Sequence, residues 1–195
     1  MSRAFVIGNG RSREGFDLKQ LRHYGKIYGC NALYRDFEPD YLIAIDDKIT
    51  EEIQASDFPS EKFIHPEFEE QWEHPEFNPF TRLRSNAGMN AMIEALRHGH
   101  REIICLGFDF IILNELGTSN MYEGSNAYGP DTKTSLQDGL RRAKYLDWFA
   151  KKNHVANYRL MLPRLENLQI HRFTSSNIRG MFIDELMNYL NKSGV

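Results

Sequence analysis

The sequence predicts an α/β fold, a single Rossmann-like domain with a mainly parallel sheet and helices on both faces. Three observations predict it. The chain opens on a short apolar run, residues 4–7, that ends directly in a Gly-rich turn. Strand-like runs then alternate with helix-like ones, which is the pattern of βαβ units. With 195 residues the chain is long enough for one substantial core and short for two, so we expect one domain over residues 1–195.

Short runs rich in β-forming residues indicate the strands, and apolar residues at spacings of three and four indicate the helices. The run over residues 40–46 is apolar throughout, so we expect it to be buried on both faces. Gly99 would end the helix before it. The predicted strands are residues 4–7, 26–30, 40–46, 62–65, 102–107 and 155–161. The predicted helices are residues 17–21, 47–55, 86–98, 136–153 and 177–191.

Composition and charge exclude several classes of protein. No apolar run approaches the roughly 20 residues of a membrane span, and two cysteines are too few for a disulfide framework or a four-thiolate zinc site, which favours a cytoplasmic location. The net charge of −3 divides into +4 over residues 1–36, −11 over residues 37–79 and +4 over residues 80–195. We therefore expect no nucleic-acid partner, because no basic face dominates. The basic flanks contain Arg11, Arg13 and Arg84, which the fold would bring towards one anion pocket.

Two segments interrupt the alternation of strands and helices. Residues from about 56 to 80 form an acidic excursion in which His-Pro-Glu-Phe occurs at 65–68 and again at 74–77, and we expect a solvated surface insertion there. Residues from about 113 to 134 are rich in Gly, Ser and Asn. A loop of that length is uncommon unless it is functional or mobile, so we predict a lid over the carboxyl ends of the strands.

The turn after the first strand, Gly8-Asn9-Gly10-Arg11-Ser12, is the first candidate ligand site. Glycines let the backbone approach a phosphate closely, and the Ser12 hydroxyl adds a donor. Ligands of open α/β sheets bind at the carboxyl ends of the strands, where this turn is expected. The turn matches neither the dinucleotide-binding Gly pattern nor a Walker loop, and a plain tight turn is the alternative.

Polar residues follow two further predicted strands. Asn31 offers amide donors and an acceptor suited to a nucleobase edge or a ribose, or it caps a turn. Asp46 and Asp47 would accept ribose hydroxyls or hold a divalent cation such as Mg²⁺. The alternative for Asp46 is the N-cap of the next helix.

A third group opens the helix over residues 86–98, in the run Arg84-Ser85-Asn86-Ala87-Gly88. Arg84 and the backbone N–H groups of a helix N-terminus would make an anion site, and Ser85 or Asn86 would cap the helix. Asp109 lies between two phenylalanines at the end of the run over residues 102–107, and we expect it to be structural, bonding to loop backbone. The seven histidines form no metal-binding pattern.

Taken in order, these motifs resemble those of the bacterial lipooligosaccharide sialyltransferases. Those enzymes have a Gly-Asn-Gly-x-Ser turn, a Cys-Asn pair, an Arg-x-Thr-Ser-Gly helix start and a Gly-x-Asp-Phe strand end. The resemblance covers roughly residues 4–160. The run from Pro39 to Asp46 also resembles the related domain family of 6-hydroxymethylpterin diphosphokinase, which shares the Rossmann-like fold.

The resemblance to the sialyltransferases implies a cytidine nucleotide site. Gly8, Asn9, Gly10 and Ser12 would face the phosphate and ribose, and Asn31 would contact the nucleotide. Arg84 matches the family's arginine, whereas Asn86 and Ala87 stand in place of its Thr-Ser, followed by Gly88. Tyr122 and Tyr128 would supply hydroxyls to the leaving phosphate, but the family's basic histidine has no counterpart between residues 111 and 147.

The favoured function is a glycosyltransferase that takes a nucleotide sugar, such as a CMP-linked donor, as its substrate. One alternative is diphosphate transfer from ATP to a small alcohol, with Mg²⁺ held by Asp46 and Asp47. The other is a nucleotide-binding or interaction module without catalysis. The nucleotide or nucleotide sugar is the expected partner, and homo-oligomer formation stays open.

Overall fold

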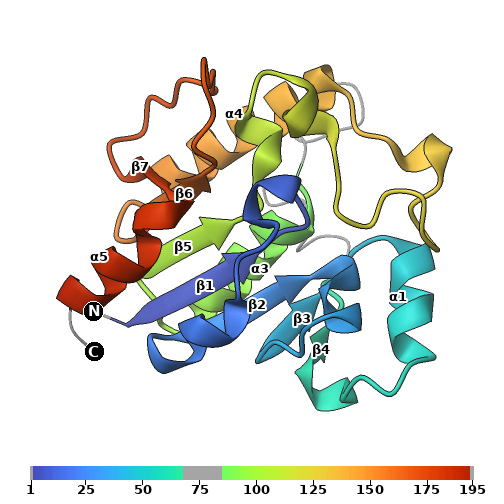
Figure 1. Cartoon of the computed structure of the whole chain (residues 1–195). Coiled ribbons are helices and arrows are strands. Elements are labelled where there is room, and N and C mark those ends of the chain that lie inside the picture. Colours follow the sequence, from blue (N-terminus) through green and yellow to red (C-terminus); the bar gives the residue numbers. More distant parts are fainter. Residues whose placement is uncertain (1, 68–84, 194–195) are drawn as a thin grey trace.

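A computed structural model describes residues 2–67 and 85–193 of the chain. Within these residues, seven strands form one sheet in the order β4-β3-β2-β1-β5-β6-β7, and every neighbouring pair runs parallel (Figure 1). The predicted α/β, Rossmann-like fold is confirmed. The strands are β1 (Arg3–Ile7), β2 (Lys26–Cys30), β3 (Tyr41–Ile43), β4 (Phe63–Ile64), β5 (Glu102–Leu106), β6 (Asn157–Leu162) and β7 (Ile178–Phe182).

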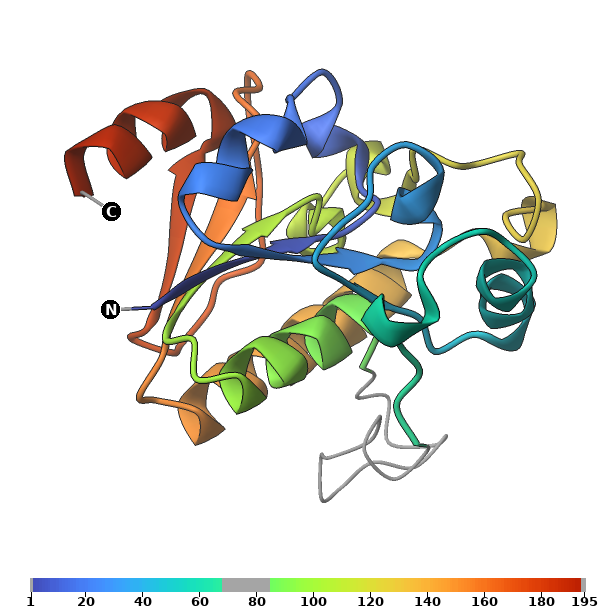
Figure 2. The same cartoon turned by 90° about the horizontal axis from the view of Figure 1, so that it is seen from below.

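Helices cover both faces of the sheet. Seen from below, α3 and α4 lie on one face, and α5 lies on the other with the 3₁₀-helices η1 and η2 of the N-terminal segment (Figure 2). The α-helices are α1 (Asp47–Gln54), α3 (Ala87–Arg97), α4 (Leu136–Lys152) and α5 (Leu186–Ser193). The 3₁₀-helices are η1 (Arg11–Arg13), η2 (Leu18–His23), η3 (Asn31–Arg35), η4 (Ser60–Lys62), η5 (Asp109–Ile111), η6 (Glu115–Thr118), η7 (Pro130–Thr132) and η8 (Ile183–Glu185).

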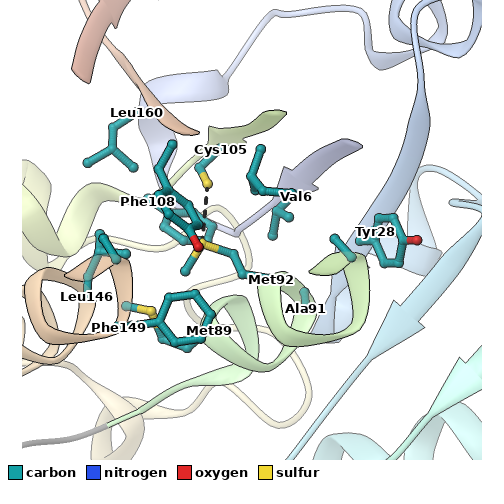
Figure 3. Packing of buried hydrophobic residues seen from close by; sticks show 14 of the residues in the cluster. Val6, Tyr28, Met89, Ala91, Met92, Cys105, Phe108, Leu146, Phe149 and Leu160 are labelled. Carbon is teal, nitrogen blue, oxygen red and sulfur yellow. Dashed lines mark hydrogen bonds between the residues drawn. The ribbon is translucent and has the colours of Figure 1, made fainter. Parts of the chain in front are cut away.

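The apolar strands of the sheet supply a core on each face. In β1, Ala4 and Val6 join the cluster under α3 and α4, whereas Phe5 and Ile7 join the cluster on the opposite face. This division follows from the alternation of side chains along a strand, and it explains why the strands are apolar throughout. Figure 3 shows the first cluster closing around the thiol of Cys105, which donates to the sulfur of Met92 at 3.8 Å.

Both cysteines lie in this core. Cys30 and Cys105 are buried and carry free thiols. Burial raises the pKa of Cys30 to about 12, because a thiolate would be charged in an apolar surrounding, and it raises the pKa of Cys105 as well.

Local signals set the ends of several elements as the sequence predicts. The Asn86 side chain caps α3 by accepting the N–H of Met89 at 3.0 Å, and Gly99 follows the helix with a φ of +87°. Ser135 and Asp138 form a capping box at the start of α4. The helix predicted over residues 17–21 forms as the 3₁₀-helix η2, and the Asp17 side chain caps it by accepting the N–H of Lys19.

The predicted helix over residues 177–191 is wrong in its first half. Residues Ile178–Phe182 form β7, which pairs with β6 along its whole length, and the α-helix begins only at Leu186. Gly180 interrupts the helical pattern, and the apolar residues Met181 and Leu186 are five apart, which does not fit one helix face. The strand over residues 40–46 is also shorter than predicted, because pairing in β3 stops at Ile43.

The predicted acidic excursion falls partly outside the described residues. Residues 56–67 contain η4 and the edge strand β4, which pairs with β3. The second His-Pro-Glu-Phe copy and Arg84 lie in the range 68–84, outside the described residues. None of the helices that the structure describes is long and apolar enough to cross a membrane.

Candidate functional site

The carboxyl ends of β1 and β5 meet where the strand order reverses, which is the usual ligand position in open α/β sheets. The loops after these strands touch each other. The N–H of Gly8 donates to Leu106 at 2.8 Å, and the N–H of Gly10 donates to Gly107 at 3.0 Å. A Cβ on Gly8 would lie 2.6 Å from the Gly107 carbonyl oxygen, so the close approach of the two chains requires glycine.

Asp109 holds the turn after β1 in place. Its Oδ2 accepts the N–H of Ser12 at 2.8 Å, and its Oδ1 accepts the Ser12 hydroxyl. Burial raises the pKa of Asp109, and the bonds from Ser12 and the charge of Arg13 oppose that rise. The predicted structural role of Asp109 is confirmed, and the Ser12 hydroxyl is already engaged as a donor.

Asn9 and Asn31 each bury an amide oxygen without a hydrogen-bond partner among the described residues. Asn9 follows Gly8 in the turn and is 9% exposed, and Asn31 is the first residue after β2. The backbone of Asn31 has a φ of +53°, a left-handed conformation that asparagine tolerates better than most residues. An unsatisfied buried oxygen costs about 1–3 kcal/mol, so two at one sheet edge are typical of a prepared binding site.

Tyr128 reaches this edge from the segment over residues 113–134, which the sequence predicts to be a lid and which we call the lid below. The Asn9 amide nitrogen lies 3.5 Å from the Tyr128 hydroxyl, at the long limit of a hydrogen bond. Burial raises the pKa of Tyr128 well above its usual range; the charge of Asp46 adds to that rise and the backbone N–H of Ala32 opposes it. The hydroxyl is therefore neutral and available as a donor. Asp46 occupies the N-cap position of α1 without a capping bond from its side chain.

Tyr122 lies beside Tyr128, with 6.0 Å between the ring centroids. Its hydroxyl donates to Asp36 at 2.7 Å. Burial and the Asp36 hydrogen bond raise the pKa of Tyr122 to about 12, and the charge of Arg13 opposes the rise. Both predicted tyrosines are thus at the strand ends, as neutral hydroxyls.

Arg35 joins the end of η3 to the lid and was not anticipated from the sequence. Its Nε and Nη2 donate to Glu52 at 2.8 Å and 2.7 Å. The guanidinium also donates to the Ser125 hydroxyl and to the Asn126 carbonyl, each at 2.8 Å. It lies 5.7 Å and 5.9 Å from the ring centroids of the two lid tyrosines. A signal was available, because Arg35 is four residues beyond Asn31 in the helix that follows β2.

The lid is docked on the strand ends. The N–H of Met121 donates to the Asn9 carbonyl at 2.9 Å, and the Asn126 amide donates to Glu52 at 2.6 Å. In Figure 1 the yellow segment accordingly reaches down beside α1. Ala127 has a φ of +64°, a strained backbone for alanine, so the docked lid stores strain at its tip.

Known proteins resemble this chain only distantly. No protein-family model and no curated protein matches the chain. One similar solved structure is the sialyltransferase CstII from Campylobacter jejuni in complex with a substrate analogue, CMP-3FNeuAc, with 12% sequence identity and a TM-score of 0.44 over 97% of this chain and 99% of that one. Another is the sialyltransferase CST-II in complex with trisaccharide acceptor and CMP, with 14% identity and a TM-score of 0.41 over 98% and 99%.

Of the remaining residues predicted for the site, some have structural roles and Arg84 lies outside the described residues. Asn86 caps α3, and a Cβ on Gly88 would lie 2.6 Å from the ring of Phe108, which also contacts Gly8. Arg84, predicted as an anion ligand, lies outside the described residues. In the part of the chain that the structure describes, no three His, Cys, Asp or Glu side chains converge as a metal site would require.

An open cleft of about 630 Å³ lies between α1 and the lid. Its lining is mostly polar and comprises Tyr34, Lys48, Glu51, Glu52, Ala55, Ser56, Asn126 and Ala127. Glu52 and Asn126 belong both to this cleft and to the contacts that dock the lid. The cleft therefore adjoins the edge that carries Asn31 and Tyr128.

Proposed function

We propose that the chain binds a nucleotide sugar at the carboxyl edge of β1 and β2 and transfers its glycosyl group to a hydroxyl acceptor. The observation that carries the proposal is the pair of buried, unpartnered amide oxygens of Asn9 and Asn31 beside the lid tyrosines. Such oxygens would accept hydrogen bonds from the amino group of a nucleobase or from the hydroxyls of a ribose. The resemblance of the ordered motifs to sialyltransferases supports a CMP-linked donor.

The geometry suits departure of a phosphate. In glycosyl transfer the bond from the anomeric carbon to the phosphate oxygen breaks and its electron pair leaves with the phosphate. The acceptor oxygen bonds to that carbon, and the proton of the acceptor hydroxyl passes to the departing phosphate or to solvent. Negative charge grows on the leaving phosphate, and preorganised donors stabilise it. The neutral hydroxyl of Tyr128 is such a donor, whereas the single proton of the Tyr122 hydroxyl is already donated to Asp36. The turn from Gly8 to Gly10 offers backbone close to the same edge. The α1–lid cleft, with its polar lining, would receive a sugar or another polyhydroxy acceptor.

Titration calorimetry with CMP, UMP, GMP and AMP and their sugar conjugates tests the proposal. We expect binding of at least one nucleotide to the wild-type chain and a tenfold or greater loss in Asn31→Gly, since glycine keeps the left-handed backbone while it removes the amide. Asn167 has a φ of +57° in an exposed loop, so Asn167→Gly is the matched control and should bind normally. Absence of heat with every nucleotide would refute the proposal.

Two further measurements separate the alternatives. Metal-dependent ATP binding that Asp46→Asn abolishes would favour diphosphate transfer, because that reaction needs Mg²⁺ on carboxylates. Tight nucleotide binding without turnover across a broad panel of donors and acceptors would favour a binding module. A donor sugar that is consumed only when an acceptor is present would select glycosyl transfer.

A further inference from the structure

Arg13 is a buried cation beside the turn after β1, and the contacts described so far assign it no role. It ends η1, directly after the Gly-rich turn, and is 5% exposed. Its Nε donates to the Gly8 carbonyl at 2.7 Å, which fixes the guanidinium beneath the turn. Its Nη2 is buried and has no hydrogen-bond partner among the described residues, and none of their carboxylates forms an ion pair with it.

The side chain of arginine carries a positive charge, and a buried charge without an ion-pair partner is costly. Asp109 attracts the guanidinium, since the charge of Arg13 opposes the rise of the Asp109 pKa, but the two side chains form no ion pair. Asp109 already uses both carboxylate oxygens to hold Ser12, and Asp36 accepts the hydroxyl of Tyr122. The fold therefore buries a guanidinium whose Nη2 has no hydrogen-bond partner, and an anion would supply one.

The side chain of Arg13 lies close to the lid. Arg13 lies beside Tyr122, where its charge and a hydrogen bond from its side chain oppose the rise of the hydroxyl pKa that burial and Asp36 cause. The same turn is bonded to the lid through the Asn9 carbonyl and the N–H of Met121. The unpartnered Nη2 of Arg13 thus belongs to a guanidinium that lies between the turn and the lid, next to the Tyr122 hydroxyl.

We propose that Arg13 is the phosphate-binding residue of this site, with Nη2 donating to a phosphate oxygen of the ligand beside the Tyr122 hydroxyl. The nucleotide identity of that ligand rests on the proposed function, whereas the phosphate chemistry rests on Arg13 itself. Arginine suits the task because its charge is permanent and its donors have a fixed geometry. The buried position would strengthen the contact, because water does not screen it.

The variant Arg13→Gln isolates this role. The amide nitrogen of glutamine stands where arginine has Nε, so the donor to Gly8 is retained while Nη2 and the charge are removed. Arg22→Gln is the control, since Arg22 is also an arginine of a 3₁₀-helix before β2, but it donates to the Glu38 carbonyl at 2.6 Å and stacks on the ring of Phe37. Calorimetry would measure affinity for CMP and for inorganic pyrophosphate, and melting curves without ligand would measure stability.

We expect Arg13→Gln to bind CMP and pyrophosphate about 10- to 100-fold more weakly, because a charge-assisted hydrogen bond is lost. The affinity of Arg22→Gln should stay within about twofold of the wild type. Without ligand, Arg13→Gln should melt within a few degrees of the wild-type temperature, because the cost of burying the charge and its attraction to Asp109 are removed together. A residue with a merely structural role would lower the melting temperature and leave affinity unchanged.

The outcomes separate the two proposals. Equal affinity of Arg13→Gln and the wild type for CMP overturns the role of Arg13 and leaves the nucleotide site standing. Pyrophosphate binding that depends on Arg13, in a chain that binds no nucleotide, supports Arg13 and overturns the proposed function. A wild-type chain that binds neither compound overturns both.

Discussion

The contacts of Arg35 predict how strongly the lid is held. Arg35→Met removes two charge-assisted hydrogen bonds to the lid, to Ser125 and Asn126, and two cation–π contacts with the lid tyrosines. Each hydrogen bond contributes about 1 kcal/mol once partial solvent exposure is allowed for. Each ring contact contributes about 0.5 kcal/mol. The docked lid should therefore lose about 3 kcal/mol relative to an undocked one.

The substitution Arg35→Met should weaken the docking of the lid without leaving Glu52, the carboxylate that pairs with Arg35, unpaired. Glu52 keeps the hydroxyl of Tyr34 and the amide of Asn126 as donors after the substitution, so its carboxylate is not left unpaired. Since 1.4 kcal/mol is a factor of ten, the undocked population should rise about 100-fold. Methionine fills a similar volume, which limits effects on packing.

Hydrogen–deuterium exchange measures this population directly. The N–H groups of Met121, Ser125 and Tyr128 are bonded within the lid or to the turn, and they should exchange about 100-fold faster in Arg35→Met. Arg22→Met is the control, since Arg22 also stacks on a ring, that of Phe37, and donates to a carbonyl, but away from the lid. Lid exchange within threefold of the wild type would refute the assignment of Arg35 as the residue that holds the lid.

Three further substitutions test other parts of the structure. In Gly10→Ala the new Cβ would lie 2.3 Å from the Asp109 carboxyl carbon, so the melting temperature should fall by about 4–8 °C, equivalent to roughly 2 kcal/mol, and ligand binding should be lost with it. Ala127→Gly relieves the left-handed backbone at the lid tip and should raise the melting temperature by about 1–2 °C, whereas Ala143→Gly within α4 should lower it. Burial of Asp147 favours its neutral form, but hydrogen bonds from neighbouring hydroxyls and amides outweigh that and lower its pKa to about 2, below the unfolded value of about 3.9. Its stabilisation is present above pH 4 and lost between about pH 4 and pH 2, so Asp147→Asn should unfold with a weaker pH dependence across that range, and equal slopes in acid titrations would contradict this.

The fold was largely predictable because strand burial and turn glycines are local signals. Residues 26–30 form the predicted strand without a change of boundary, and α3 begins after the predicted cap at Asn86. The error at β7 shows where local signals fail. Leu186 and Leu190 do belong to a helix, but whether the five residues before it extend as a strand depends on a free edge of β6. That edge exists only after the sheet has assembled.

The site was predictable in its turn and asparagines and less so in its charges. Gly8, Asn9 and Asn31 follow strands directly, so parallel topology alone brings them to one edge. Arg35 and Glu52 meet across 17 positions of sequence, and their contact depends on how α1 packs against η3. The unpartnered nitrogen of Arg13 depends on burial, which composition does not reveal.

The burial of both cysteines has a practical consequence for experiments. Cys30 and Cys105 are enclosed by the core, and their raised pKa values keep the thiolate population small at neutral pH. Maleimide reagents should therefore not react with the native chain. A single cysteine placed on the lid, for example by Glu123→Cys, could carry a fluorophore without removal of either natural thiol, and the same molecule would then report lid opening in real time.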